Sequence, residues 1–511
     1  MLAAALCGCV AAGQTQSPPD SAAKPRQTNA RPAKVNPALQ ELLDGAAAAP
    51  PEFGADVLIR LSESSRVPTA AAKIDLLSKA FDLASRAELP VKRAGSLGNI
   101  LDGRSSLLVR AYRLNLDGLS LQSRVISDML AVDPARARRM VEQVQIPSLP
   151  PVGCDQRLTY DLGLFYQALG KVASTAFTAK EKEKGRQVTL LAPFVSNLQS
   201  HAQARPVAEM LVEARLSPAD LAQLTNTFAG ALLQLHGDER SFASAVIGPG
   251  GTNASAAVAD LFSALEEKQV SVITFLKAWR QYLVTNLADE RCATLRGMAD
   301  SNALPQPAKN FNQQFRRELQ TSQIPPIAEE ELRNSRIVSP PAAAPYWQSP
   351  EAKKLWATLR ELRISSPEED APSADKTSQA WASRLSDFLE QVEAWQPQDE
   401  PASDFFQEKC VLYESLADLI PPGPQRLQVI NSIVSLLVQN SGQLPSRIEW
   451  FLPAEDLLSG RRAAGDQKEA IQALLNSGDP VLSLYARLER WEPRKNKDAA
   501  SESNPSGSEK K

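Results

Sequence analysis

Apolar residues recur at three- and four-residue spacing along most of the chain, with polar residues between them. This spacing places the apolar side chains on one face of a helix, and that face must pack against another surface. The clearest run lies in residues 189–291, where one stripe contains Val272, Phe275, Leu276, Trp279, Leu283 and Leu287. The pattern supports only layers of helix on helix, so we predict an all-α fold.

Capping and loop residues divide this pattern into separate helices. Asp133-Pro134, Ser217-Pro218 and Ser349-Pro350 each combine a side chain that caps a helix with a proline suited to its first turn. Residues 248–253 (Gly-Pro-Gly-Gly-Thr-Asn) and 421–424 (Pro-Pro-Gly-Pro) predict breaks, because glycine and proline interrupt helices.

An internal similarity indicates how the helices are arranged. Leu76–Leu83 aligns with Leu107–Leu114 at an offset of 31 residues, within the range of helical-hairpin repeats. Each hairpin in such an array must stack on its neighbour to bury its apolar face. We therefore predict an irregular helical array of α-solenoid-like hairpins with a second, smaller helical region.

The length of 511 residues exceeds the usual limit for one hydrophobic core, roughly 250 to 300 residues, so we expect two folded regions. We predict a helical-array domain over residues 37–300 and a second helical region over residues 349–492. Between them, residues 301–348 are rich in proline and predict an extended linker. Phe311, Phe315 and Leu319 could support one short helix within it.

Both ends of the chain have a different composition. Residues 14–36 and 493–511 are polar and lack an apolar period, which predicts a disordered tether and a disordered tail. Residues 1–13 are uncharged, apolar and rich in alanine. They are similar to the apolar region and cleavage zone of a secretory signal, although no positively charged region precedes them.

A short motif in this leader has a further implication. Leu6-Cys7-Gly8-Cys9 resembles a bacterial lipobox, with Cys7 where alanine or serine is usual. The resemblance implies lipidation of Cys9 and a membrane tether made of acyl chains. We expect an exported protein in the periplasm, the envelope or the medium, with Cys9 as the candidate lipid anchor.

Removal of the leader would leave three cysteines, Cys154, Cys292 and Cys410. None has a second cysteine at metal-ligand spacing, and His201 and His236 are the only histidines in the sequence, so we predict no metal site. In an exported protein a disulfide is reasonable, and we predict that Cys154 pairs with Cys292. The alternative is three buried free thiols.

The sequence contains no recognisable catalytic motif. The glycine cluster at 248–253 lacks the ending of a phosphate-binding loop, and neither a Gly-x-Ser-x-Gly elbow nor a His-Glu-x-x-His helix occurs. We interpret both histidines as surface or helix-capping residues. The carboxylate runs at 266–267, 329–331 and 368–370 lie on polar segments and point outward. Trp279, Tyr282, Trp381 and Trp395 are interpreted as core residues. We predict no catalytic, cofactor-binding or metal-binding residue, and no cofactor.

The net charge of −3 gives no basic face for nucleic acid. Helical arrays present long grooves, and by this analogy of fold we expect an exported, non-enzymatic protein that binds a protein partner or acts as an envelope scaffold. Two alternatives remain. One is an extracytoplasmic hydrolase with an acid/base carboxylate in a groove between helices. The other is a cytoplasmic adaptor, if residues 1–13 are not a signal.

Overall fold

The structure is a computed structural model of the chain, and it describes residues 36–95, 103–247, 253–288, 291–292, 304–332, 337–338, 349–364, 374–397, 401–460 and 465–493. These residues contain 23 α-helices and almost no strand, which confirms the predicted all-α helical array. Within this part of the chain, no helix is both long and apolar enough to cross a membrane. The predicted leader, with Cys9, lies outside the described residues, as do the predicted disordered ends except for Asn36 and Pro493.

The helices follow one another along the chain, most of them with short connections. The first fourteen are α1 (Pro37–Ala48), α2 (Pro51–Glu63), α3 (Ala70–Ala84), α4 (Gly103–Tyr112), α5 (Gly118–Val132), α6 (Pro134–Val141), α7 (Gly163–Thr175), α8 (Ala179–Glu183), α9 (Arg186–Ser196), α10 (Ala204–Glu213), α11 (Pro218–Leu232), α12 (Glu239–Ile247), α13 (Ala254–Glu267) and α14 (Ile273–Ala288). The last nine are α15 (Gln306–Gln314), α16 (Arg316–Thr321), α17 (Pro350–Ile364), α18 (Ala374–Ala394), α19 (Ala402–Leu419), α20 (Pro424–Gln439), α21 (Arg447–Leu458), α22 (Gln467–Leu475) and α23 (Pro480–Trp491).

Local sequence explains where several of these helices begin. The side chains of Asp133 and Ser217 accept hydrogen bonds from backbone N–H groups in the first turns of α6 and α11, and a proline follows each cap. Ser349 caps α17 in the same way, at 3.1 Å from the N–H of Ala352. These contacts satisfy N–H groups that have no partner inside the helix. The three predicted cap-and-proline starts are therefore confirmed.

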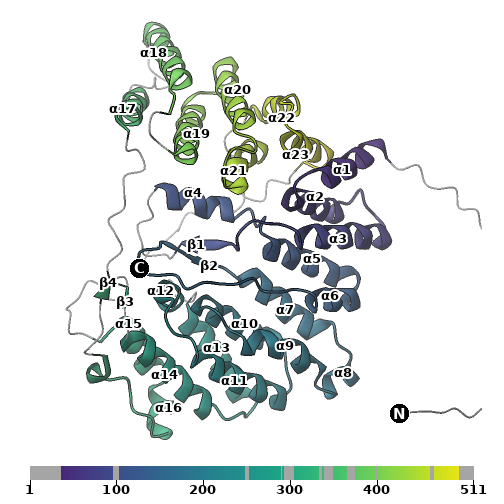
Figure 1. The fold of residues 1–511 in the computed structure, drawn as a ribbon, viewed down its shortest axis with the longest axis vertical. Coiled ribbons are helices and arrows are strands. Elements are labelled where there is room, and N and C mark those ends of the chain that lie inside the picture. The colour runs from purple at the N-terminus through teal and green to yellow at the C-terminus, as the bar shows by residue number, and fades with distance from the viewer. Residues whose placement is uncertain are drawn as a thin grey trace, which may run out of the picture.

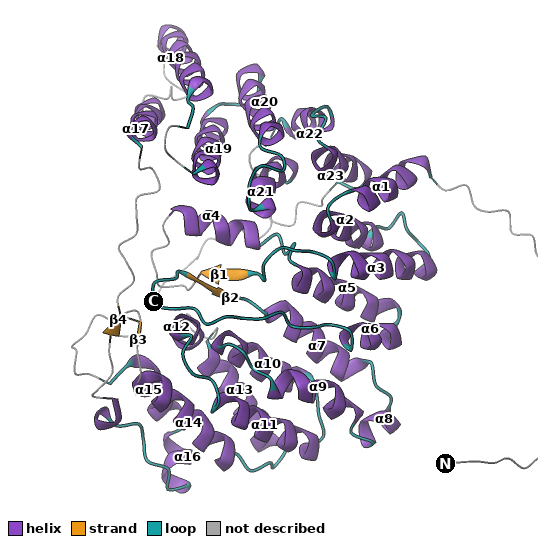
Figure 2. Ribbon diagram, in the orientation of Figure 1, coloured by secondary structure: helices purple, strands orange, loops and turns teal. Residues whose placement is uncertain are grey.

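The body of the molecule is built by stacking neighbouring helices. α2 packs on α3, α3 on α5, α5 on α7, α7 on α10 and α10 on α13, while α11 packs on both α9 and α14 (Figure 1). Two short sheets interrupt the array. β1 (Arg93–Gly95) pairs antiparallel with β2 (Leu158–Tyr160), and β3 (Arg291–Cys292) pairs parallel with β4 (Ile337–Val338) (Figure 2).

Part of the predicted extended linker is instead folded. Residues 306–321 form α15 and α16, and a 3₁₀ turn follows at Glu329–Leu332. α15 packs against α13 and α14, because Phe311 and Phe315 are buried there. The apolar spacing of Phe311, Phe315 and Leu319 therefore predicted the structure of this segment better than its proline content did. Most of the remaining linker lies outside the described residues.

The last helices of the chain return to the first ones. α23 packs against α1 and α2, and α21 packs against α4, so the yellow end of the chain lies beside the purple end in Figure 1. We call these contacts the end junction. Its ion pairs and hydrogen bonds join residues that are hundreds of positions apart: Arg447 to Glu52, Arg110 to Asp456 and Tyr485 to Asp56.

Asp56 is the centre of the end junction. Only 1% of its surface is exposed, and its carboxylate accepts hydrogen bonds from Arg124 at 2.7 Å and Tyr485 at 2.8 Å. Arg60 lies 3.0 Å away. Burial alone would raise the pKa of Asp56, but the two guanidinium groups outweigh it and lower the pKa to about 2. Asp56 is therefore a buried, ionised and fully partnered carboxylate.

Candidate functional site

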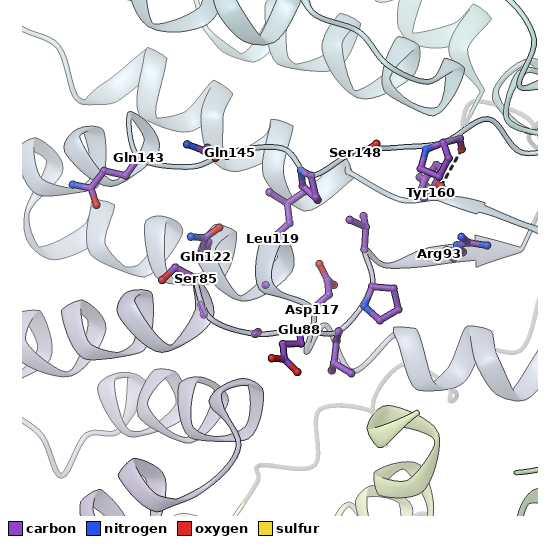
Figure 3. Close-up of a pocket in the computed structure, with 18 residues that line it drawn as sticks. Ser85, Glu88, Arg93, Asp117, Leu119, Gln122, Gln143, Gln145, Ser148 and Tyr160 are labelled. Carbon is purple, nitrogen blue, oxygen red and sulfur yellow. Dashed lines mark hydrogen bonds between the residues drawn. The ribbon is translucent and has the colours of Figure 1, made fainter. Parts of the chain in front are cut away.

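A cavity of about 650 Å³ opens between the end of α3, the start of α5 and the chain that follows α6 (Figure 3). One wall carries Gln143, Gln145 and Ser148, the opposite wall carries Ser85 and Glu88, and Asp117, Leu119 and Gln122 lie between them. Arg93 and Tyr160 stand at one end. The remaining lining residues are Ala84, Ala87, Leu89, Pro90, Val91, Gly118, Pro147 and Pro150. We call this space the α3–α5 cavity.

A glycine allows the floor of the cavity to form. A Cβ atom at Gly118 would lie 2.9 Å from the carbonyl oxygen of Ala84, closer than such atoms approach in practice. The first turn of α5 can therefore lie directly against the last turn of α3 only because residue 118 has no side chain. This close approach places Asp117, the residue before Gly118, inside the cavity.

Asp117 is the buried carboxylate of the cavity, with 4% of its surface exposed. It caps α5, accepting a hydrogen bond from the N–H of Ser120 at 3.0 Å. Burial raises the pKa of Asp117, and the hydrogen bonds from Ser120 oppose that shift. Glu88, on the adjacent wall, is exposed. The cavity thus combines one buried and one exposed carboxylate.

The end of the cavity is held by the β1–β2 pair. Arg93 and Tyr160 are cross-strand partners, and the guanidinium of Arg93 lies 5.1 Å from the centre of the Tyr160 ring. The Tyr160 hydroxyl donates a hydrogen bond to the carbonyl oxygen of Pro150 at 3.0 Å. Next to this pair, Lys92 binds Asp161 at 3.0 Å. Arg93 and Lys92 are therefore each already engaged with another side chain.

The wall formed by residues 145–148 has open hydrogen-bonding groups. Ile146 precedes Pro147 and Leu149 precedes Pro150, and a residue before proline avoids helical geometry. Among the described residues, none makes a hydrogen bond to the backbone groups of Gln145, Ile146 or Ser148. The side chains of Gln145 and Ser148 are exposed. The backbone and side-chain groups of this wall can therefore donate hydrogen bonds to a bound molecule and accept hydrogen bonds from it.

Little in the sequence indicated this site. Asp117 precedes a glycine and an apolar stripe, a pattern typical of a helix cap, but nothing local indicates that it lines a cavity. Arg93, Gln122 and Tyr160 belong to no recognisable motif. These residues come together only because α3, α5 and the segment after α6 pack against one another.

The cysteines lie elsewhere. Cys154 and Cys292, the predicted pair, are joined by a disulfide with 5.2 Å between their Cα atoms, and it closes a separation of 138 residues. Cys410 is a buried free thiol. Among the described residues, no group of three or more His, Cys, Asp or Glu side chains could hold a metal ion.

The prediction that both histidines are surface or helix-capping residues is wrong for His201. His236 is exposed, but His201 is fully buried. Its Nε2 donates to the carbonyl oxygen of Gly237 at 2.7 Å, so its Nδ1 accepts from the hydroxyl of Tyr282 at 2.9 Å. Burial lowers the pKa of His201 to about 4, which keeps the ring neutral. In the sequence, His201 comes just after an apolar stripe. This local pattern does not indicate that distant helices cover the residue.

His201 belongs to a buried polar cluster, not to a catalytic triad. The hydroxyl of Ser200 bonds to Asp238, whose other oxygen accepts from the N–H of Val152 at 2.8 Å. The imidazole therefore contacts neither the serine hydroxyl nor the aspartate that a triad would require. We call Ser200, His201, Asp238 and Tyr282 the central network. It joins α14 to the segments around residues 152, 200 and 237.

The other predicted surface and core residues can be placed directly. Glu266 binds Arg317 at 3.1 Å and Glu331 binds Arg280 at 2.6 Å, so these carboxylates make ion pairs. Residues 368–370 lie outside the described chain. The aromatic residues interpreted as core are buried: Trp279, Tyr282, Trp381 and Trp395.

Comparison of the chain with models of protein families, with curated proteins and with solved structures finds no match.

Proposed function

We propose that this protein is an exported, non-enzymatic scaffold that binds a protein partner in the α3–α5 cavity. The observation that supports this most directly is the lining, which combines apolar walls with amide, hydroxyl and open backbone groups. Such groups fix the orientation of a bound chain through hydrogen bonds, whereas the apolar walls contribute burial. The proposal of export rests on the signal-like residues 1–13 and is consistent with the disulfide.

A site-specific photo-crosslink tests this function. A benzoylphenylalanine at Gln145 should form a covalent adduct with the same protein in repeated preparations from cells that produce the chain. The matched control is Gln281 on α14, which is also an exposed glutamine. Adducts at both positions, or at neither, would contradict the proposal.

A blocking variant adds a second control. Ser148→Trp places a large ring at an exposed position of the cavity wall. It should abolish the adduct formed from position 145 while the circular dichroism spectrum stays unchanged. Retention of the adduct in this variant would mean that the partner binds outside the cavity.

A second candidate function is an extracytoplasmic hydrolase, and Asp117 is the observation that favours it. A buried carboxylate with a raised pKa inside a cavity has the properties of a general acid or base. Asp117→Asn keeps a good helix cap but removes the proton-transfer group. If hydrolysis of ester, amide or glycoside test substrates is detected, this variant should abolish it. Activity that survives the substitution would exclude Asp117 as the acid/base group.

A further inference from the structure

We infer that the occupant of the α3–α5 cavity is an extended peptide segment that carries a lysine or arginine side chain. Its backbone would lie along residues 145–148, and its cation would meet Asp117. This inference rests on the proposed partner-binding function and specifies the chemistry of the partner.

The open backbone groups favour an extended peptide over a helix. Ser148 lines the cavity and retains its N–H and C=O groups, and Ile146, two residues earlier on the same extended segment, retains its own. This is the spacing used when a strand pairs with its neighbour. On the opposite wall, the N–H groups of Leu89 and Val91 also bond to no other described residue. A helix already satisfies its own backbone groups, so it could not form backbone hydrogen bonds with either wall. An added strand can use them.

The charges of the lining favour a basic side chain. Asp117 and Glu88 both line the cavity. The hydrogen bonds that Asp117 receives come from Ser120 and from its own backbone, which are neutral groups, and the charge of Lys92 also lowers the pKa of Asp117. The nearby cations are engaged, Arg93 over the ring of Tyr160 and Lys92 with Asp161. Besides the charge of Lys92, a lysine or arginine of the peptide would give the buried carboxylate a directly bonded charged partner, whereas an acidic side chain would meet like charge.

The test uses a pool of random hexapeptides and the immobilised full-length protein. Captured peptides are sequenced by mass spectrometry. We expect lysine and arginine to be enriched about tenfold at one position relative to the starting pool, as removal of a partner from a close charge pair commonly changes affinity by that factor or more. Copies of the captured peptides with N-methylated backbones should bind at least about tenfold more weakly, because they cannot pair as strands.

Two aspartate variants make the test specific. Asp117→Asn retains the cap of α5 and should remove the enrichment. Asp479→Asn is the matched control, because Asp479 is also a buried helix cap, at the start of α23. It should leave the enrichment unchanged. Enrichment of acidic or apolar residues in place of lysine and arginine would overturn the inference. So would a lysine and arginine enrichment that persists in Asp117→Asn.

The blocking variant separates the inference from the proposed function. If Ser148→Trp abolishes capture but the captured peptides show no basic preference, partner binding in the cavity stands and the inference fails. If capture is unaffected by Ser148→Trp, both fail.

Discussion

The central network and the end junction are both groups of buried polar contacts, but different interactions stabilise them. Both bury polar groups between segments that are distant in sequence. The central network is neutral at His201 and lies in a body that is also closed by the Cys154–Cys292 disulfide. The end junction has no covalent link among its described residues and relies on ion pairs around Asp56. Ion pairs, together with the packing of Phe53 against Phe451 and Tyr485, therefore hold the ends of this array together, whereas a hydrogen-bond network with a neutral imidazole and a covalent bridge hold its centre.

The largest expected effect comes from breaking the end junction. Asp56→Ala would leave Arg60 and Arg124 without their buried partner, and loss of one partner from a buried pair costs about 3 to 5 kcal/mol. Urea unfolding followed by circular dichroism measures this loss. Asp75→Ala is the control, since Asp75 also pairs with a cation four residues later but is 61% exposed. It should change stability by less than about 1 kcal/mol. Equal losses would show that the junction does not depend on charge.

Opening the disulfide should weaken the centre. Replacement of both Cys154 and Cys292 by serine removes a constraint on a long loop, and we expect a loss of roughly 2 to 5 kcal/mol in the free energy of unfolding. Reductant should destabilise the natural chain by a similar amount and leave the double variant unchanged. A natural chain that is insensitive to reductant would argue against the bridge.

The pH dependence of stability should separate the two regions. The folded-state pKa of His201, about 4, lies below the ordinary value of 6.5, so its contribution is present above pH 6.5 and is lost as the pH falls toward 4. Between pH 7 and 4.5 this loss is about 2 to 3 kcal/mol. For Asp56, the loss occurs only as the pH falls from about 3.8 toward 2. Asp128 has the opposite effect. Its pKa is raised to about 6, so its contribution to the free energy of unfolding increases as the pH falls through this value.

A pair of histidine variants isolates this effect. His201→Gln should remove the contribution of His201, so lowering the pH from 7 to 4.5 should destabilise it by about 2 to 3 kcal/mol less than it destabilises His236→Gln, whose substitution is at an exposed position. Urea unfolding at both pH values measures the difference. An unchanged pH dependence in His201→Gln would show that His201 is not held neutral by burial.

The smallest expected effect concerns a single hydrogen bond of the central network. Tyr282→Phe removes the hydroxyl that donates to His201, and a buried group left without its partner costs about 1 to 3 kcal/mol. Gln281→Ala, on the same helix, removes only a surface hydrogen bond to Thr285 and should cost less than about 0.5 kcal/mol. Thermal unfolding of both variants makes the comparison, and equal losses would show that the Tyr282 hydroxyl contributes nothing beyond a surface contact.

The helices of this protein could be predicted from local sequence. Apolar spacing and capping residues such as Asp133 and Ser217 act over a few positions, so their effect can be read from the chain. The same local rule predicts the helix at Phe311, where a count of prolines suggested a linker.

Which helices meet could not be predicted in this way. Asp56 and Tyr485 are 429 residues apart, and nothing in the neighbourhood of either residue indicates the other. The burial of His201 and the position of Asp117 in a cavity follow in the same way from the packing of distant helices. The physical reason is that helix formation depends on neighbouring residues, whereas burial, pKa and cavities depend on everything that the fold brings around a side chain.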